Sequence, residues 1–445
     1  MTSPALFDLW SDAFATVAGP DAGPWHDRRA AALEAFGSLG WPGRKHEEYR
    51  YLSFRRIAGT AWRPAPAPTV DDAVRAAVDA AAFDEEGARV VLVDGHLVPE
   101  LSTVADDVTV LPLADAIAVH GDRMAALVAA ELDTPVDGLV ALQQAFATRG
   151  VVVHVGRDVE VRGAVHLVHV TSSANGAAHF VTPQHFVLAD RFARVHVVES
   201  WTSVEGTDAE RLVMPSVFVD VADGASVDHV KVQLDAASAD HVGRGWVRVG
   251  RDARYHHFIF GLGGRLYRDT HTIRATDPGS ETLLSALWAP RPGQSIDLHT
   301  AIDHLVPDCT SDQLYKCVLG ERGHGVFNGK VFVRQDAQRT AAEQLNKNLL
   351  LHPTARVDTK PQLEIFADDV TCAHGATIGR LDSDELFYLH ARGIDEAVAR
   401  QMLVEGFAED VLDRLDLPGL YAALRSLVLD AVATNASGSD DPGVA

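Results

Sequence analysis

The sequence predicts a mainly β protein, in which a long stack of short strands lies between two helical regions. From about residue 150, apolar and polar residues alternate for more than two hundred residues, with turns rich in Gly, Asp and Pro. A period of two is typical of strands, because successive side chains point to opposite faces of a sheet. Little helical periodicity interrupts this region, so we expect many short strands.

The strands recur in a way that favours a parallel β-helix. Repeats spaced roughly 20 to 30 residues apart are typical of a solenoid, because each turn of the coil buries its inward face on its neighbours. A β-sandwich is the competing fold, and it needs hairpin turns between paired strands. Only Asp223-Gly224 and Asn328-Gly329 could supply them. Four similar triplets each open a strand after a turn, with a small residue suited to a tight corner: Ala193-Arg194-Val195, Ala225-Ser226-Val227, Ala253-Arg254-Tyr255 and Ala355-Arg356-Val357.

Both ends of the chain have helical patterns. Near the N-terminus, residues 27–36 and 71–82 are Ala-rich and amphipathic, and the charged and aromatic run at 44–51 is interpreted as a solvated helix face. Near the C-terminus, Asp382 and Glu385 have capping-box spacing, and Gly393 stands where a helix would end. We therefore expect a helix-rich N-terminal domain (1–135), a β-helix core (136–382), a helical C-terminal domain (383–436) and a disordered tail (437–445).

Composition limits the classes of partner. The formal net charge of −23 over 445 residues repels nucleic acid and anionic lipid surfaces. The first 30 residues show no secretory signal, and no apolar run approaches the ~20 residues needed to span a bilayer. The sequence thus predicts a cytoplasmic protein that binds neither nucleic acid nor membrane.

The three cysteines, Cys309, Cys317 and Cys372, lack CxxC spacing and indicate a reducing compartment. Cys309 and Cys317 lie near His299, His304 and His324 in the sequence, which leaves a metal cluster open as a minor alternative. The 21 histidines are scattered, and His256 and His257 should point to opposite faces of a strand. We expect most of them at the surface or in the core.

Several sequence blocks resemble one known family. Residues 368–382 contain the form Cys372-Ala373-His374-Gly375-Ala376, which is similar to the C-terminal signature of the SufB/SufD family and in particular to its SufD branch. The supporting matches are residues 385–389, 392–394, 325–330, 344–351 and 359–365, together with Lys45 and 47–49 near the N-terminus.

This resemblance implies a right-handed parallel β-helix between two helical domains, in a non-catalytic scaffold of iron-sulfur cluster assembly. It implies pairing with SufB through the edges of the β-helix, docking of the ABC-type ATPase SufC on the C-terminal helices, and a homodimer as an alternative for the isolated chain. It also implies a transient iron-sulfur cluster shared with SufB and no permanently bound cofactor. Consistent with an ATPase in another subunit, the chain has no Walker A pattern.

His374 is the main candidate for contact with the cluster. Imidazole and thiolate are suitable iron ligands, and a histidine at its ordinary pKa is largely neutral at cellular pH. Alternation places Cys372 and His374 on the face of Val370, so both should enter the core if Val370 does. A buried imidazole would then need a hydrogen bond or a metal. The resemblance implies that the matching SufD histidine lies at the SufB interface, and it carries that role to His374. Cys372 is a second candidate, although a buried cysteine usually acts only as a small apolar side chain.

The C-terminal helices are the second candidate site. After residue 395 the spacing predicts an apolar stripe on one helix face, formed by Leu403, Phe407, Val411 and Leu415 with Val398 and Met402 beside it. This stripe could hold a helical partner or pack on the β-helix. Only the family resemblance assigns SufC to it. The expected partner-binding residues are Leu386, Phe387, Tyr388, Arg392, Gly393, Met402 and Phe407.

Two other functions compete with the SufD reading. A SufB-type paralogue would itself supply the acceptor thiol, which the low cysteine count and the Cys372-to-Gly375 form disfavour. A β-helix carbohydrate-active enzyme would need an exposed carboxylate cluster, and the missing secretory signal argues against it.

Overall fold

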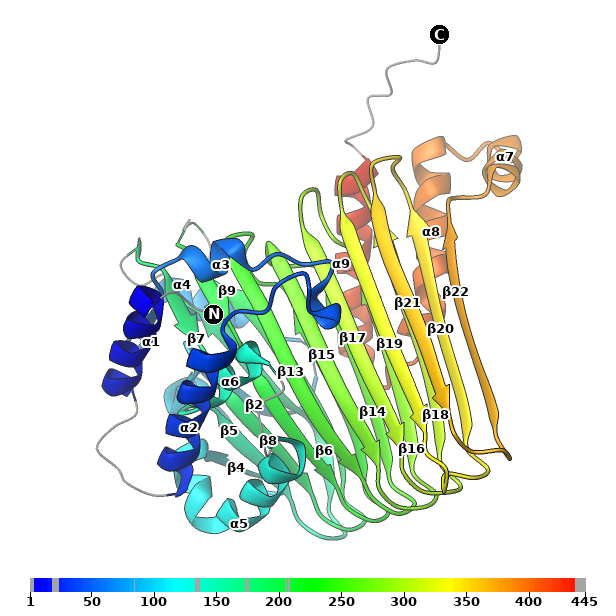
Figure 1. The fold of residues 1–445 in the computed structure, drawn as a ribbon. Coiled ribbons are helices and arrows are strands. Elements are labelled where there is room, and N and C mark those ends of the chain that lie inside the picture. Colours follow the sequence, from blue (N-terminus) through cyan, green and yellow to red (C-terminus); the bar gives the residue numbers. More distant parts are fainter. Residues whose placement is uncertain are drawn as a thin grey trace.

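The centre of the molecule is a coil of about seven turns whose strands stack in two sheets (Figure 1). The computed structural model describes residues 4–17, 24–83, 85–132, 137–172, 176–204, 206 and 209–436. All pairings between successive turns are parallel, as in β13 with β15 and β12 with β14. The predicted β-solenoid flanked by helices is therefore confirmed, and the predicted tail at 437–445 lies outside the described residues.

Alternate strands belong to opposite sheets. The main path of the 12-stranded sheet is β21 (Arg356–Ile365), β19 (His324–Val333), β17 (Ser295–His304), β15 (Leu266–Ala275), β13 (Ala239–Val249), β11 (Ser216–Val221), β8 (Gln184–Ala189), β5 (Val151–Val155) and β4 (Thr109–Pro112), with β1 (Arg63–Pro64), β7 (His179–Val181) and β10 (Arg211–Val213) beside it. The 10-stranded sheet runs in the order β22 (Thr371–Gly379), β20 (Ala341–Leu350), β18 (Thr310–Leu319), β16 (Glu281–Trp288), β14 (Arg254–Gly261), β12 (Ser226–Gln233), β9 (Arg194–Ser203), β6 (Glu160–Thr171), β2 (Gly87–Val93) and β3 (His96–Leu97).

Small buried residues mark the corners of the coil. Ala193, Ala225 and Ala253 are all buried and lead into β9, β12 and β14. Each follows a residue with positive φ: 62° at Phe192, 68° at Gly224 and 51° at Asp252. Left-handed backbone reverses the chain sharply, so these three triplets mark corners. The fourth, at Ala355, also opens a strand, β21, but Ala355 is only half-buried. Neither candidate hairpin exists, because Gly224 lies at such a corner and Asn328-Gly329 lies inside β19.

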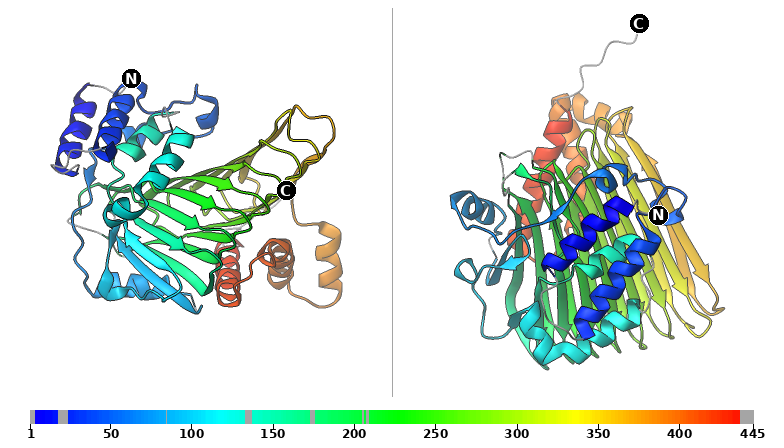
Figure 2. Two further views of the ribbon diagram at one scale, coloured as in Figure 1. Left: turned by 90° about the horizontal axis from the view of Figure 1, so that it is seen from below. Right: turned by 60° about the vertical axis from the view of Figure 1, so that its left-hand side comes forward.

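Helices cover the outer face of each sheet (Figure 2). On the 12-stranded sheet, α5 packs through Ala116 and Met124 against an aromatic stack on β8, β11 and β13. On the 10-stranded sheet, α8 and α9 bury Val404, Leu420 and Leu424. The helices are α1 (Pro4–Val17), α2 (Pro24–Leu39), α3 (Arg55–Gly59), α4 (Asp72–Ala80), α5 (Leu113–Leu132), α6 (Gly138–Ala145), α7 (Ser383–Ala391), α8 (Glu396–Leu412) and α9 (Pro418–Ala436), with 3-10 turns η1 (Glu47–Tyr49) and η2 (Pro99–Leu101).

The charged run at 44–51 is not a solvated helix face. It contains only the short η1, and Tyr49 is buried beside Arg268, whose guanidinium lies 4.4 Å from the ring centroid. Glu48 pairs with Lys330 and His299, while Glu47 pairs with Lys360 on β21. The hydrogen bond from His299 is the largest influence holding the pKa of Glu48 well below its usual range. The run therefore fastens the N-terminal region to the outside of the solenoid.

Across the described ranges, no helix is both long and apolar enough to cross a membrane.

Candidate functional site

The last turn of the coil leaves two strand edges without a neighbour. In the described sheets, β21 pairs only with β19 and β22 pairs only with β20. We call the outer edges of β21 and β22 the open end of the solenoid (Figure 1, right). Unpaired backbone groups along a strand edge are a template for another strand. Three large apolar side chains are exposed there: Ile365, Phe366 and Ile378.

His374 lies in β22 at this open end. Val370 and Cys372 are partly buried and pack against the solenoid core, as alternation predicts. His374 is exposed, however, although it shares their face. The expectation that it would enter the core with them is wrong, because among the described residues no further turn of the coil covers β22. Its imidazole is accessible to a molecule that docks on the open end.

Cys372 is half-buried, and burial raises the pKa of its thiol. A raised pKa favours the protonated thiol, whereas metal ligation requires the thiolate. Cys372 therefore needs an added positive charge, such as a metal ion, before it can act as a ligand.

The possible cluster around Cys309 and Cys317 does not form. Both cysteines are buried, and Cys309 Sγ donates weakly to the carbonyl of Pro307 at 3.4 Å. Burial raises the pKa of Cys317 well above its ordinary value. Within the described part of the chain, no three His, Cys, Asp or Glu residues are placed to hold a metal ion. The nearby histidines bond elsewhere: His299 with Asp297, His304 with Ser311 and His324 with Asp358.

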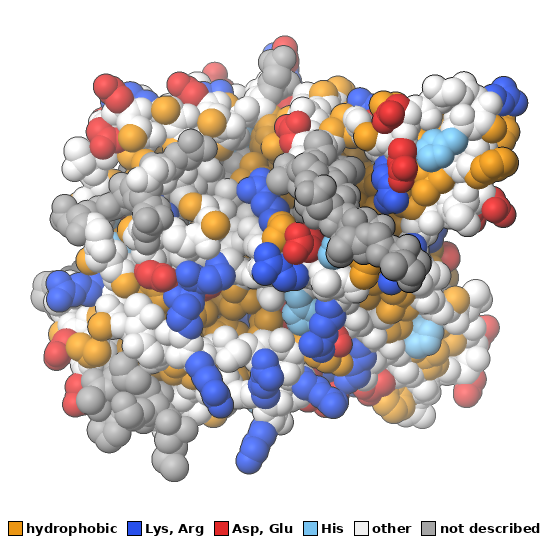
Figure 3. Space-filling model, turned by 90° about the horizontal axis from the view of Figure 1, so that it is seen from above, with side chains coloured by type: hydrophobic (Ala, Val, Ile, Leu, Met, Phe, Trp, Pro, Cys, Tyr) orange, Lys and Arg blue, Asp and Glu red, His pale blue; other side chains and the backbone are white. Residues whose placement is uncertain are grey.

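The C-terminal helices divide the expected partner-binding residues into two groups. Phe387 is 73% exposed and Tyr388 is 57% exposed on α7, and Met402 is exposed on α8. Arg392 and Gly393 are also exposed, while Leu386 is half-buried. Hydrophobic side chains are visible at the end of the molecule that carries α7 (Figure 3, right).

Phe407 belongs to the second group, because it packs on its own chain. Its ring lies 4.5 Å from Lys316 Nζ, and Lys316 Nζ donates to its carbonyl at 2.6 Å. Phe407 also packs against the cluster of α8, α9 and the 10-stranded sheet. Part of the predicted stripe is therefore internal, and the exposed surface is on α7 and the start of α8.

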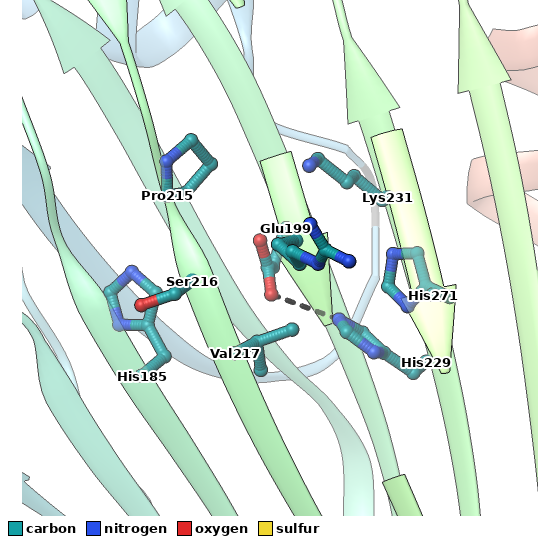
Figure 4. Close-up of a pocket in the computed structure, with 9 residues that line it drawn as sticks. His185, Glu199, Pro215, Ser216, Val217, His229, Lys231 and His271 are labelled. Atoms are coloured by element: carbon teal, nitrogen blue, oxygen red, sulfur yellow. Dashed lines mark hydrogen bonds and ion pairs between the residues drawn. The ribbon is translucent and has the colours of Figure 1, made fainter. Parts of the chain in front are cut away.

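A buried polar cluster inside the solenoid was missed in the sequence. Glu199, His229 and Lys231 line a cavity of about 10 Å³ together with His185 and His271 (Figure 4). Glu199 pairs with His229 at 2.9 Å, and Lys231 Nζ pairs with Asp269 at 2.6 Å. Burial lowers the pKa of His185 to about 4. Buried charged side chains are tolerated only when they are paired. The sequence signal that could have revealed this cluster is the recurrence of polar residues about one turn of the coil apart, as in His229 beside His257.

Together these features define a class: a β-solenoid with a buried polar cluster inside it, an exposed histidine on a terminal strand with one free edge, and an apolar helical surface beside it. Two family models match the chain: "SUF system FeS cluster assembly, SufBD core domain" over residues 169–407 and "SufBD protein N-terminal region" over residues 3–167. The chain belongs to the SufBD family of iron-sulfur cluster assembly proteins, and it is SufD-like.

Curated relatives agree with this assignment. The chain is 30% identical to an iron-sulfur cluster assembly SufBD family protein of Synechocystis, over 93% of this chain and 92% of that protein. It is 30% identical to the iron-sulfur cluster assembly protein SufD of Escherichia coli, over 87% of this chain and 88% of that protein. It is also 36% identical to the chloroplastic protein ABCI7 of Arabidopsis thaliana, over 52% of this chain and 49% of that protein.

Proposed function

We propose that this chain is a non-catalytic scaffold subunit that pairs with a SufB-type paralogue at its open end and contacts a nascent iron-sulfur cluster through His374. The cluster is cargo and is passed on, so no permanent cofactor is part of the proposal. The observation that carries it is the exposure of His374 on a terminal strand whose outer edge has no neighbour among the described strands.

The chemistry of the open end suits this role. A paralogue with its own terminal strands can satisfy the free edges of β21 and β22 by strand addition. Docking there would cover Ile378 and Phe366 and enclose His374 between two subunits. One neutral imidazole can ligate iron, and a site with few ligands can release its cargo. The same edges would allow two isolated copies of the chain to form a homodimer.

We propose further that the SufC ATPase docks on the exposed surface of α7 and α8. Phe387, Tyr388 and Met402 are large and exposed, and α7 begins shortly after β22 in the sequence. A partner that moves α7 would therefore act through a short link, residues 380–382, on the strand that holds His374.

The test is His374→Ala in cells that produce the complete assembly. Cluster yield, measured as iron and acid-labile sulfide in the purified complex, should fall while all subunits still co-purify. Cys372→Ser serves as the neighbouring control and should reduce the yield less. An unchanged yield with His374→Ala would remove the assigned role.

A further inference from the structure

A row of hydrogen-bonded side chains runs inside the solenoid toward the open end. Gln344 on β20 donates from Nε2 to Gln313 Oε1 on β18 at 2.8 Å. Gln313 donates in turn from Nε2 to Thr300 Oγ1 on β17 at 2.9 Å. All three side chains are buried. Gln313 thus accepts at Oε1 from Gln344, the member of the row nearest the open end, and donates at Nε2 to Thr300.

The outermost oxygen of this row lacks a partner. Gln344 is 1% exposed, and its Oε1 is buried with no hydrogen-bond partner among the described residues. A buried carbonyl oxygen left unpaired is costly. The amide cannot turn away easily, because its Nε2 is held by Gln313. The position therefore calls for a donor from the next layer.

That layer is β22, and the residue in register with Gln344 is His374. The two neighbouring pairs are Ala342 with Cys372 and Asn346 with Ala376. Because Cys372 packs on the core, alternation puts His374 on the same inward face as Gln344. His374 is therefore the residue of β22 that lies next to Gln344, and an imidazole N–H is the kind of donor that the unpaired oxygen lacks.

We propose that Gln344 is a positioning residue for His374: a turn of the exposed imidazole, which is not bonded to Gln344 in the structure, brings a ring N–H to Oε1 and so fixes the tautomer. In a neutral imidazole one nitrogen carries the proton and the other carries the lone pair. Holding the proton toward Gln344 leaves the lone pair directed away from the coil. Histidine ligands of metals commonly have their second nitrogen held in this way by a carbonyl or carboxylate. This inference rests on the proposed function, and it names the group that would prepare His374 for the cluster.

Gly329 lies beside this row and leaves space for the amide of Gln344. A Cβ atom at Gly329 on β19 would lie 2.4 Å from Gln344 Nε2 and 2.5 Å from the ring of Phe327. No side chain can therefore occupy position 329 while the glutamine amide keeps its place. The absence of a side chain here leaves room for the amide of Gln344.

The direct test is ¹⁵N NMR of the histidine rings in the full-length chain, with the His374 signals assigned by their loss in His374→Ala. In the parent protein we expect one dominant tautomer and a ring N–H that exchanges slowly with water. In Gln344→Met, which keeps the length of the side chain but removes the acceptor, the slow exchange and the single tautomer should be lost. Identical ring spectra in the two proteins would overturn the proposal.

Two further variants separate positioning from general damage. Gln344→Glu retains an oxygen that can accept from His374. The Gln313 amide can rotate and donate to the new carboxylate, because the Thr300 hydroxyl serves as donor or acceptor. The Gln344→Glu protein should therefore keep the slowly exchanging His374 N–H. Gln362→Met makes the same change as Gln344→Met on neighbouring β21, outside the row, and should leave the His374 ring unchanged. Loss of the slow N–H in Gln362→Met would contradict the proposal.

Cluster formation gives the second readout. Gln344→Met should lower the yield of the complete assembly by about tenfold, the lower range for removing a partner of a ligand. Combined with His374→Ala it should lower the yield no further than His374→Ala alone, because both changes affect one interaction. An unchanged yield in His374→Ala would overturn the proposed function, and the ring spectra would still decide whether the hydrogen bond exists.

Discussion

The two ends of the solenoid are finished differently. At the N-terminal end, β2 and β5 are each covered by a short antiparallel strand, β3 and β4, and the inward side chains Leu92 and Val153 are completely buried. At the open end, β21 and β22 are long and have a neighbour on one side only. Short edge strands protect a sheet from further pairing, whereas long unpaired edges invite it. One end is therefore completed by this chain, and the other is suited to completion by a partner.

The largest expected effect lies in the covered part of the stack. Lys231→Met removes the cation that pairs with Asp269 and leaves that buried carboxylate with Tyr267 and His271 beside it. Breaking a buried pair in this way costs about 3 to 5 kcal/mol. The free energy of unfolding from urea titration should fall by this amount.

The control for Lys231 is the same substitution at the open end. Lys360→Met on β21 removes an ion pair with Glu47 at the surface, and surface pairs contribute little. We expect no measurable loss of stability. Equal losses in the two variants would mean that the covered interior and the open end do not differ in the way described.

Acid should weaken the covered interior before it affects the open end. In the unfolded chain His185 has a pKa near 6.5, and burial lowers the pKa to about 4 in the folded protein. Between these values the unfolded state binds a proton that the folded state does not. The free energy of unfolding should therefore decrease as the pH falls from 6.5 to 4, by about 3 kcal/mol from this group.

His185→Asn is expected to reduce that pH dependence, because it removes the titrating ring and keeps an acceptor for the Val151 N–H. His390→Asn on exposed α7 is the matched control and should leave the slope as it was. Urea titrations at pH 7, 6, 5 and 4 measure both. A slope that is the same in the parent and His185→Asn would contradict the assignment.

The sequence predicted the parts of this fold that depend on neighbouring residues. The corner alanines Ala193 and Ala225 and the helix cap Asp382 are where local patterns placed them. Contacts between distant segments could not be predicted in this way. Glu48 pairs with Lys330 because the coil brings the outside of β19 beneath η1, and the exposure of His374 follows from the lack of another turn, which no local pattern encodes.

Association at the open end should be sensitive to a change that leaves the fold intact. Ile378→Asp places a charge on a side chain that is 56% exposed, so the monomer should unfold at the same urea concentration as the parent. A buried carboxylate at the interface should weaken binding of a SufB-type partner at least tenfold. Analytical ultracentrifugation or titration calorimetry measures the affinity, and an unchanged dissociation constant would place the partner elsewhere.

The smallest effect is expected on the helices beside the open end. Phe387→Ala removes a large exposed ring from α7, and truncating a peripheral contact residue typically costs about 1 kcal/mol of binding free energy. The dissociation constant of the SufC complex should therefore rise about fivefold, with no loss of folding stability. Phe407→Ala is the contrasting variant, since its ring packs beside Lys316 within the chain. It should destabilise the folded protein, whereas Phe387→Ala should not. If Phe407→Ala weakened SufC binding without destabilising the fold, the docking surface would extend along α8 instead of ending at α7.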